Sequence, residues 1–118
     1  MAKEESEIQR EILEFLSWAG IFSWRNYTGG IPHGKFLAQN PAKGAPDILG
    51  QTPDGRLLGI EVKTKTGKPT KEQQQFINLI NMQGGIGFIA RSVEDVVERI
   101  GDITGGKITK RCSTFLTD

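Results

Sequence analysis

The fold of this chain is decided by residues 47–63, which read DILGQTPDGRLLGIEVK. Two strand-like runs, residues 47–50 and 56–64, flank the central TPDG, a type I turn signal with Pro at its second position. With Gly55 left-handed in a bulge, this turn makes a three-residue loop and pairs Thr52 with Arg56. The pattern therefore predicts a β-hairpin of known register.

That register brings two acids face to face. Asp47 lies directly across from Glu61, with Cβ atoms roughly 5 Å apart on one face of the hairpin. Lys63 falls on the same face, whereas Ile60 and Val62 point to the other, where they can pack under a helix. Two facing carboxylates repel each other unless a cation lies between them, and their hard oxygens suit Mg²⁺ or Mn²⁺.

Beside such an ion, the Lys63 ammonium could hold a phosphate oxygen or orient an attacking water. This face of the hairpin is therefore a phosphodiester-hydrolysis site in outline. The alternative interpretation is an exposed sheet face with an ordinary cross-strand ladder of Asp, Glu and Lys side chains.

The flanking sequence predicts helices and strands around the hairpin. An amphipathic helix over residues 4–19 is followed by a short strand at 21–26 and a long loop to residue 46. A capping box at Thr70 and Gln73 starts a second helix that runs to about residue 83, and a strand at 86–90 precedes a third helix beginning near Ser92. Residues 102–118 are expected to form a hairpin or to pair with another chain. This order predicts a single α/β domain over residues 1–118, a mixed sheet flanked by helices.

The first helix supplies a candidate third acid. At 100° per residue, Glu5 lies about 20° from Ile12, inside the apolar stripe. A carboxylate there costs free energy unless it has a partner, so Glu5 is a candidate for the same site. A frayed first turn would explain Glu5 equally well, and Glu4 and Glu7 compete for the role.

Composition narrows the function classes. The 118 residues carry a formal net charge of +1, but residues 25–43 contain no acid and residues 56–71 contain only Glu61. Such local basic patches can hold phosphates. A single Cys112 and a single His33 exclude an intramolecular disulfide framework and a Ser/His/Asp triad. With no apolar run long enough to cross a membrane and a polar N-terminus, the chain is expected to be cytoplasmic. Trp18 and Trp24 are expected in the core.

The chain resembles the virus-type replication-repair nuclease (VRR-NUC) family of the PD-(D/E)XK nuclease superfamily. Six pieces within residues 5–90 carry the resemblance, in order: Glu5-x-x-Ile8-Gln9, Trp24-Arg25-Asn26 with Thr28-Gly29, Gly44-x-Pro46-Asp47, Ile60-Glu61-Val62-Lys63, Thr70-x-x-Gln73-x-x-Phe76, and Gly84-Gly85.

The resemblance implies a restriction-endonuclease-like αβββαβ core and a metal-dependent DNA endonuclease. Asp47, Glu61 and the Val62 carbonyl would ligate Mg²⁺ or Mn²⁺, with Lys63 as the catalytic lysine and Glu5 and Gln73 completing the catalytic set. It also implies a homodimer acting on branched DNA such as Holliday junctions. The residues expected to contact the nucleic acid are Arg25, Asn26, Lys35, Lys43, Lys65 and Lys68.

Two other functions compete with this hypothesis. A protein that binds branched DNA without cutting it would keep a salt-sensitive affinity. An interaction or scaffold domain, whose charged face is incidental, would bind no nucleic acid at all.

Overall fold

The computed structural model describes residues 3–26 and 43–104 of the chain. The elements follow the order α1 (Glu5–Trp18), β1 (Phe22–Arg25), β2 (Ile48–Gln51), β3 (Leu57–Val62), α2 (Lys71–Met82), β4 (Ile86–Ala90) and α3 (Val93–Thr104). The strands form one sheet in the order β1-β2-β3-β4, antiparallel except for the parallel pair β3 and β4. The predicted α/β fold with a mixed sheet is confirmed.

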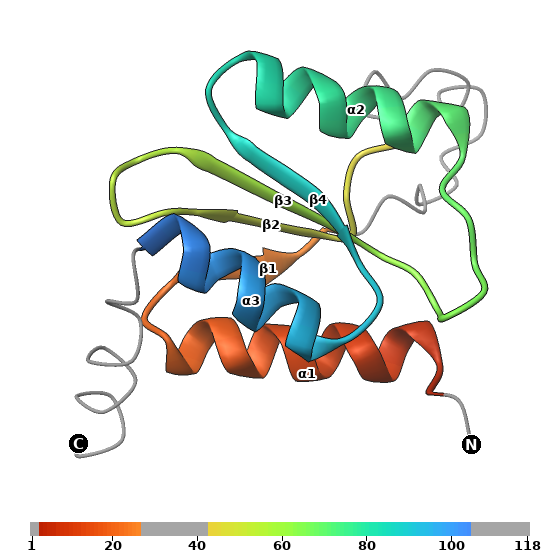
Figure 1. The fold of residues 1–118 in the computed structure, drawn as a ribbon, viewed down its shortest axis with the longest axis horizontal. Coiled ribbons are helices and arrows are strands. Elements are labelled where there is room, and N and C mark those ends of the chain that lie inside the picture. The colour runs from red at the N-terminus through yellow and green to blue at the C-terminus, as the bar shows by residue number, and fades with distance from the viewer. Residues whose placement is uncertain (1–2, 27–42, 105–118) are drawn as a thin grey trace, which may run out of the picture.

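The sheet lies between two layers of helices, with α2 on one face and α1 and α3 on the other (Figure 1). Ile60 and Val62 of β3 are fully buried on the α1 and α3 face, as strand alternation predicts. Their side chains join one hydrophobic core, whose buried members are Ile8, Ile12, Leu16, Ala19, Ile21, Ile48, Leu58, Ile60, Val62, Ile86, Ala90, Val96 and Ile100.

The hairpin has the predicted register. Thr52 N–H donates to the Arg56 carbonyl at 2.8 Å, and Ile48 pairs with Ile60 at the far end of the ladder. Gly55 has a φ of +88°, the left-handed conformation that closes the three-residue loop and that a glycine adopts without strain. Turn chemistry alone was enough to set which residues of β2 and β3 face each other.

Helix α2 packs closely on the second face of the sheet. Asn81 on the helix accepts from the Gly87 N–H at 2.8 Å and donates to the Gly87 carbonyl at 2.9 Å. A Cβ on Gly59 would lie 2.7 Å from the Ile80 Cδ1 atom and 3.0 Å from Pro46 Cγ, so a side chain at this strand position would displace the side chains that pack there. The face that carries Glu61 is therefore covered by a helix rather than open to solvent.

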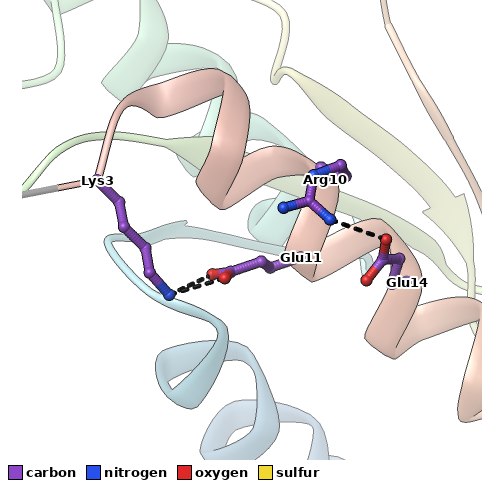
Figure 2. A network of polar contacts seen from close by, with 4 residues as sticks. All are labelled: Lys3, Arg10, Glu11 and Glu14. Atoms are coloured by element: carbon purple, nitrogen blue, oxygen red, sulfur yellow. Dashed lines mark hydrogen bonds and ion pairs between the residues drawn. The ribbon is translucent and has the colours of Figure 1, made fainter.

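Two ion pairs lie along α1. Lys3 binds the Glu11 carboxylate at 2.7 Å and Arg10 binds Glu14 at 3.0 Å, and Figure 2 shows both pairs on the helix surface. The pKa of Lys3 is raised, mainly by its hydrogen bond with Glu11 and also by the charge of Glu7. The Glu7 carboxylate thus acts electrostatically on Lys3.

Three expectations differ from the structure or lie outside it. Helix α3 continues to Thr104 through Gly101, so the expected hairpin from residue 102 is wrong at its start, because one glycine costs a helix only about 1 kcal/mol. Trp18 and Trp24 are 39% and 43% exposed rather than in the core, because each lies at the rim of the sandwich. His33, Lys35 and Cys112 lie outside the described residues. Over residues 3–26 and 43–104, no helix is long and apolar enough to cross a membrane.

Candidate active site

Asp47 and Glu61 face each other where β2 and β3 diverge. Hydrogen-bonded and non-hydrogen-bonded pairs alternate along an antiparallel ladder, and side chains approach most closely in the latter. Thr52 and Arg56 form a hydrogen-bonded pair, so continuing the observed register to Asp47 places it opposite Glu61 in a non-hydrogen-bonded pair. The backbone therefore brings the two carboxyl groups together.

Hydrogen bonds at the end of the β2–β3 ladder fix the orientation of the Asp47 carboxylate. Asp47 Oδ2 accepts a hydrogen bond from the Val62 backbone N–H at 3.0 Å, and its own carbonyl accepts from the Asn26 N–H at 2.7 Å. The Asn26 side chain donates to the Pro46 carbonyl at 3.2 Å. The Pro46 carbonyl is thus bound by the Asn26 side chain, directly after β1. The Val62 N–H binds the Asp47 side chain instead, which is thereby held beside Glu61.

Glu61 is a buried acid. It is only 1% exposed, and its Oε1 atom accepts a hydrogen bond from Gln73 Nε2 of α2 at 3.1 Å. Its Oε2 atom is buried without a hydrogen-bond partner among the described residues. An ordinary exposed ladder of charged side chains is therefore excluded for this position.

The surroundings of Glu61 strongly favour its protonated form. Burial, which is the largest cause, and the neighbouring Asp47 carboxyl group raise its pKa to about 9, against a smaller lowering by Lys63. We therefore expect Glu61 to keep its proton at neutral pH when no cation is bound.

Lys63 and Glu5 both act on Glu61. Lys63 is half-buried directly after β3, and its charge lowers the pKa of Glu61, whereas the charge of Glu5 raises it. Glu5 is half-buried, and Glu4 and Glu7 are exposed. Of the three acids that compete for the first-helix role, only Glu5 is among the charges that shift the Glu61 pKa.

The donor set fits a hard divalent cation with few protein ligands. Over the described ranges, no three Asp, Glu, His or Cys side chains gather as a metal-binding group. Asp47 and Glu61 are two oxygen donors with one buried oxygen unpartnered. Mg²⁺ is commonly held by one or two carboxylates and retains several waters, which is compatible with this pair.

The residues expected to contact nucleic acid have different surroundings. Lys43, Lys65 and Lys68 are exposed. Arg25 is half-buried, and its Nε atom has no hydrogen-bond partner in the described part of the chain. The Asn26 amide is bound to the backbone of Pro46, so it stabilises the strand end next to Asp47.

One residue near the site had no signal in the sequence analysis. Arg91, directly after β4, donates hydrogen bonds from Nη1 to the carbonyls of Thr64 and Gly67 in the loop that follows Lys63. Because β3 and β4 are parallel, their carboxyl ends lie at the same edge of the sheet. The parallel pairing therefore places Arg91 next to the loop that follows Lys63, and the sequence alone did not give this pairing.

Comparison with known proteins gives a match in fold. No protein-family model and no curated protein matches the chain. A solved structure described as "VRR_NUC domain" superposes with a TM-score of 0.60 at 24% identity, covering 81% of this chain and 92% of that one. A second, "VRR_NUC domain protein", gives 0.57 at 20% identity, covering 85% and 87%.

These similarities establish the architecture. The chain has the fold of a VRR_NUC domain, as the motifs within residues 5–90 predicted. The arrangement found in the structure, two juxtaposed acids with a lysine two positions after the second, lies on that fold at the carboxyl end of β3.

Proposed function

We propose that this protein is a divalent-metal-dependent DNA endonuclease of the VRR-NUC family that acts on branched DNA, such as Holliday junctions, as a homodimer. The observation that carries the proposal is the pair of Asp47 and Glu61, in which Asp47 is half-buried and Glu61 is 1% exposed with an Oε2 atom that has no partner among the described residues. Burying one carboxyl group directly beside a second costs free energy that a purely structural site has no reason to incur. The solved structures with the same fold carry the name of a nuclease domain.

The roles of the residues follow from their positions. Asp47, Glu61 and the Val62 carbonyl would hold Mg²⁺ or Mn²⁺. The ion would polarise the scissile phosphodiester and lower the pKa of a bound water. Asp47 is oriented by the Val62 N–H and Glu61 by the Gln73 amide, so both carboxylates are aligned before any ligand arrives.

Lys63 supplies a positive charge next to the acids. Its half-buried ammonium lies close enough to Glu61 to lower the pKa of that group, and it would bind a non-bridging phosphate oxygen or orient the attacking water. Glu5 adds negative charge from α1, which would strengthen cation binding. The exposed Lys43, Lys65 and Lys68, with Lys35 and Arg25, would contact the DNA backbone.

The test is cleavage of labelled DNA over a titration of Mg²⁺ or Mn²⁺. Four-way junction, flap and linear duplex substrates are compared for the wild type and for Asp47→Ala and Lys63→Ala. Cleavage that requires the cation and is lost in both variants supports the proposal. Binding without cleavage in the wild type would instead favour a non-catalytic DNA-binding protein, and absence of binding at low salt a scaffold domain.

Anomalous diffraction provides an independent test of the cation. A crystal soaked in Mn²⁺ should show a peak between Asp47 and Glu61. A peak elsewhere, or none at millimolar Mn²⁺, would contradict the assignment of the ligands.

A further inference from the structure

The loop between β3 and α2 is bound by the side chain of Arg91. Arg91 Nη1 donates to the carbonyl oxygens of Thr64 and Gly67, each at 2.6 Å, and lies 3.3 Å from that of Lys65. The loop is closed on itself by the Gly67 N–H, which is 3.2 Å from both the carbonyl and the Oγ1 atom of Thr64. Charge-assisted hydrogen bonds of this length are among the stronger contacts in a protein.

These contacts begin at the residue after Lys63. The Lys63 N–H donates to the Ala90 carbonyl at 3.0 Å, which extends the parallel ladder of β3 and β4 by one residue. The next residues along the two strands, Arg91 after Ala90 and Thr64 after Lys63, are also in contact, because the Arg91 side chain binds the Thr64 carbonyl. The backbone of Lys63 is therefore held on both sides by consecutive residues at the end of β4.

Arg91 is itself anchored to the start of α3. Its backbone N–H donates to Asp95 Oδ2 at 2.9 Å, and the Asp95 N–H in turn contacts Ser92 Oγ at 3.3 Å. The guanidinium is half-buried beside a hollow that is also lined by Lys3, Glu11 and Lys65. Among the described residues, its hydrogen-bond partners are backbone carbonyls and it forms no ion pair with a carboxylate.

We propose that Arg91 is a positioning residue: by binding the carbonyls of Thr64 and Gly67, it fixes Lys63 against the acidic pair. This inference rests on the proposed nuclease function. A planar guanidinium suits this task better than an ammonium, because its donors are spread over a rigid fork that can span a turn.

The experiment compares Arg91→Met, Arg91→Lys and Arg99→Met. Methionine keeps much of the side-chain length without the donors, and lysine restores a charge and part of the hydrogen bonding. Arg99 is the matched control because it is an exposed arginine on α3 whose guanidinium lies over the Phe88 ring, 5.6 Å from its centroid, away from the loop.

Steady-state cleavage should separate kcat from KM. Misplacing a catalytic group costs about 10- to 100-fold in rate, so Arg91→Met should lower kcat by that factor, with KM for DNA changed less than about threefold. Arg91→Lys should be intermediate and Arg99→Met unchanged. Amide hydrogen exchange of residues 64–67 should be faster in Arg91→Met than in the wild type, whether or not DNA is present.

Other outcomes would overturn the inference. Wild-type kcat in Arg91→Met would show that Lys63 does not depend on Arg91. A fall of about 1 in the slope of log affinity against log salt would make Arg91 a direct phosphate contact instead. Should the wild type itself fail to cleave DNA, the proposed function fails first, whereas an active wild type with an equally active Arg91→Met refutes this inference alone.

Discussion

The side-chain amide of Gln73 joins the start of α2 to the buried acid Glu61. Its Oε1 atom accepts the Thr70 N–H at 2.8 Å, completing the capping box, while its Nε2 atom donates to Glu61 Oε1 at 3.1 Å. The two contacts favour the same orientation of the amide, because a 180° flip would exchange Oε1 and Nε2 and break both of them. A residue that starts a helix thereby also orients a candidate metal ligand.

Two substitutions separate these roles of Gln73. Gln73→Ala and Thr70→Ala each break the capping box, so each should lower the free energy of unfolding by about 1 kcal/mol. Only Gln73→Ala also removes the donor to Glu61, and loss of such a supporting contact should weaken Mn²⁺ binding roughly 10-fold or more. Urea unfolding and calorimetric titration measure the two effects. Equal Mn²⁺ affinities in the two variants would contradict an orienting role for Gln73.

The raised pKa of Glu61 predicts a pH-dependent stability for the metal-free protein. Unfolded, this carboxyl loses its proton near pH 4.5, whereas folded it keeps the proton to about pH 9. Between these values the folded state binds one more proton, so the free energy of unfolding should fall as pH rises, by about 1.4 kcal/mol per unit from this group alone.

Urea unfolding in EDTA from pH 5 to 9 checks this dependence. Glu61→Gln has a neutral side chain of the same size, which can still accept from Gln73, so the variant should lose this part of the slope. An identical pH profile in the wild type and Glu61→Gln would show that Glu61 is ionised in the folded protein.

Cation binding should release that proton. At pH 7, Glu61 with a pKa of about 9 carries a proton that a divalent ion must displace. Titration of Mn²⁺ in buffers of different ionisation enthalpy should therefore report about one proton released per site. Mn²⁺ binding with no proton release at pH 7 would be inconsistent with the proposed ligand pair.

The sequence predicted local geometry better than tertiary contacts. The turn at residues 52–55 left one register for the hairpin, and the capping box at Thr70 located the start of α2, because both depend on residues close in the chain. The family resemblance implied only that Gln73 belongs to the site, and its contact with Glu61 came from the structure, since nothing in the spacing places α2 on that face of the sheet.

Other features depended on packing that no local pattern encodes. The contact of Arg91 with Thr64 joins residues 27 positions apart, and it exists because β4 pairs in parallel with β3. Trp24 was assigned to the core from the average burial of tryptophan, yet it lies on β1 at the edge of the sheet, beyond the strands that α2 covers. Which face each helix covers is decided by the whole sandwich.

The exposed lysines after β3 should control affinity for DNA rather than the rate of cleavage. Lys65→Ala and Lys68→Ala each remove one candidate phosphate contact, so the slope of log affinity against log salt should fall by about 1 for each. Fluorescence anisotropy with Ca²⁺ in place of Mg²⁺ measures the slope. Lys71, the first residue of α2 and also exposed, provides a comparison. An unchanged slope in both variants would exclude the loop from the DNA interface.

Glu5 and Glu7 test which acid of α1 serves the site. The charge of Glu5 contributes to the raised pKa of Glu61, whereas that of Glu7 acts on Lys3. Glu5→Gln should therefore lower the pKa of Glu61 in the metal-free protein and weaken Mn²⁺ binding roughly 10-fold, the lower end for residues that support metal ligands. Glu7→Gln should change neither.

Both substitutions keep side-chain size and remove one negative charge from the first turn of the same helix. Any effect on the helix dipole is therefore shared, and the difference between the variants isolates proximity to Glu61. A larger loss of Mn²⁺ affinity in Glu7→Gln than in Glu5→Gln would reverse the assignment and move the acid of the first helix away from Glu5.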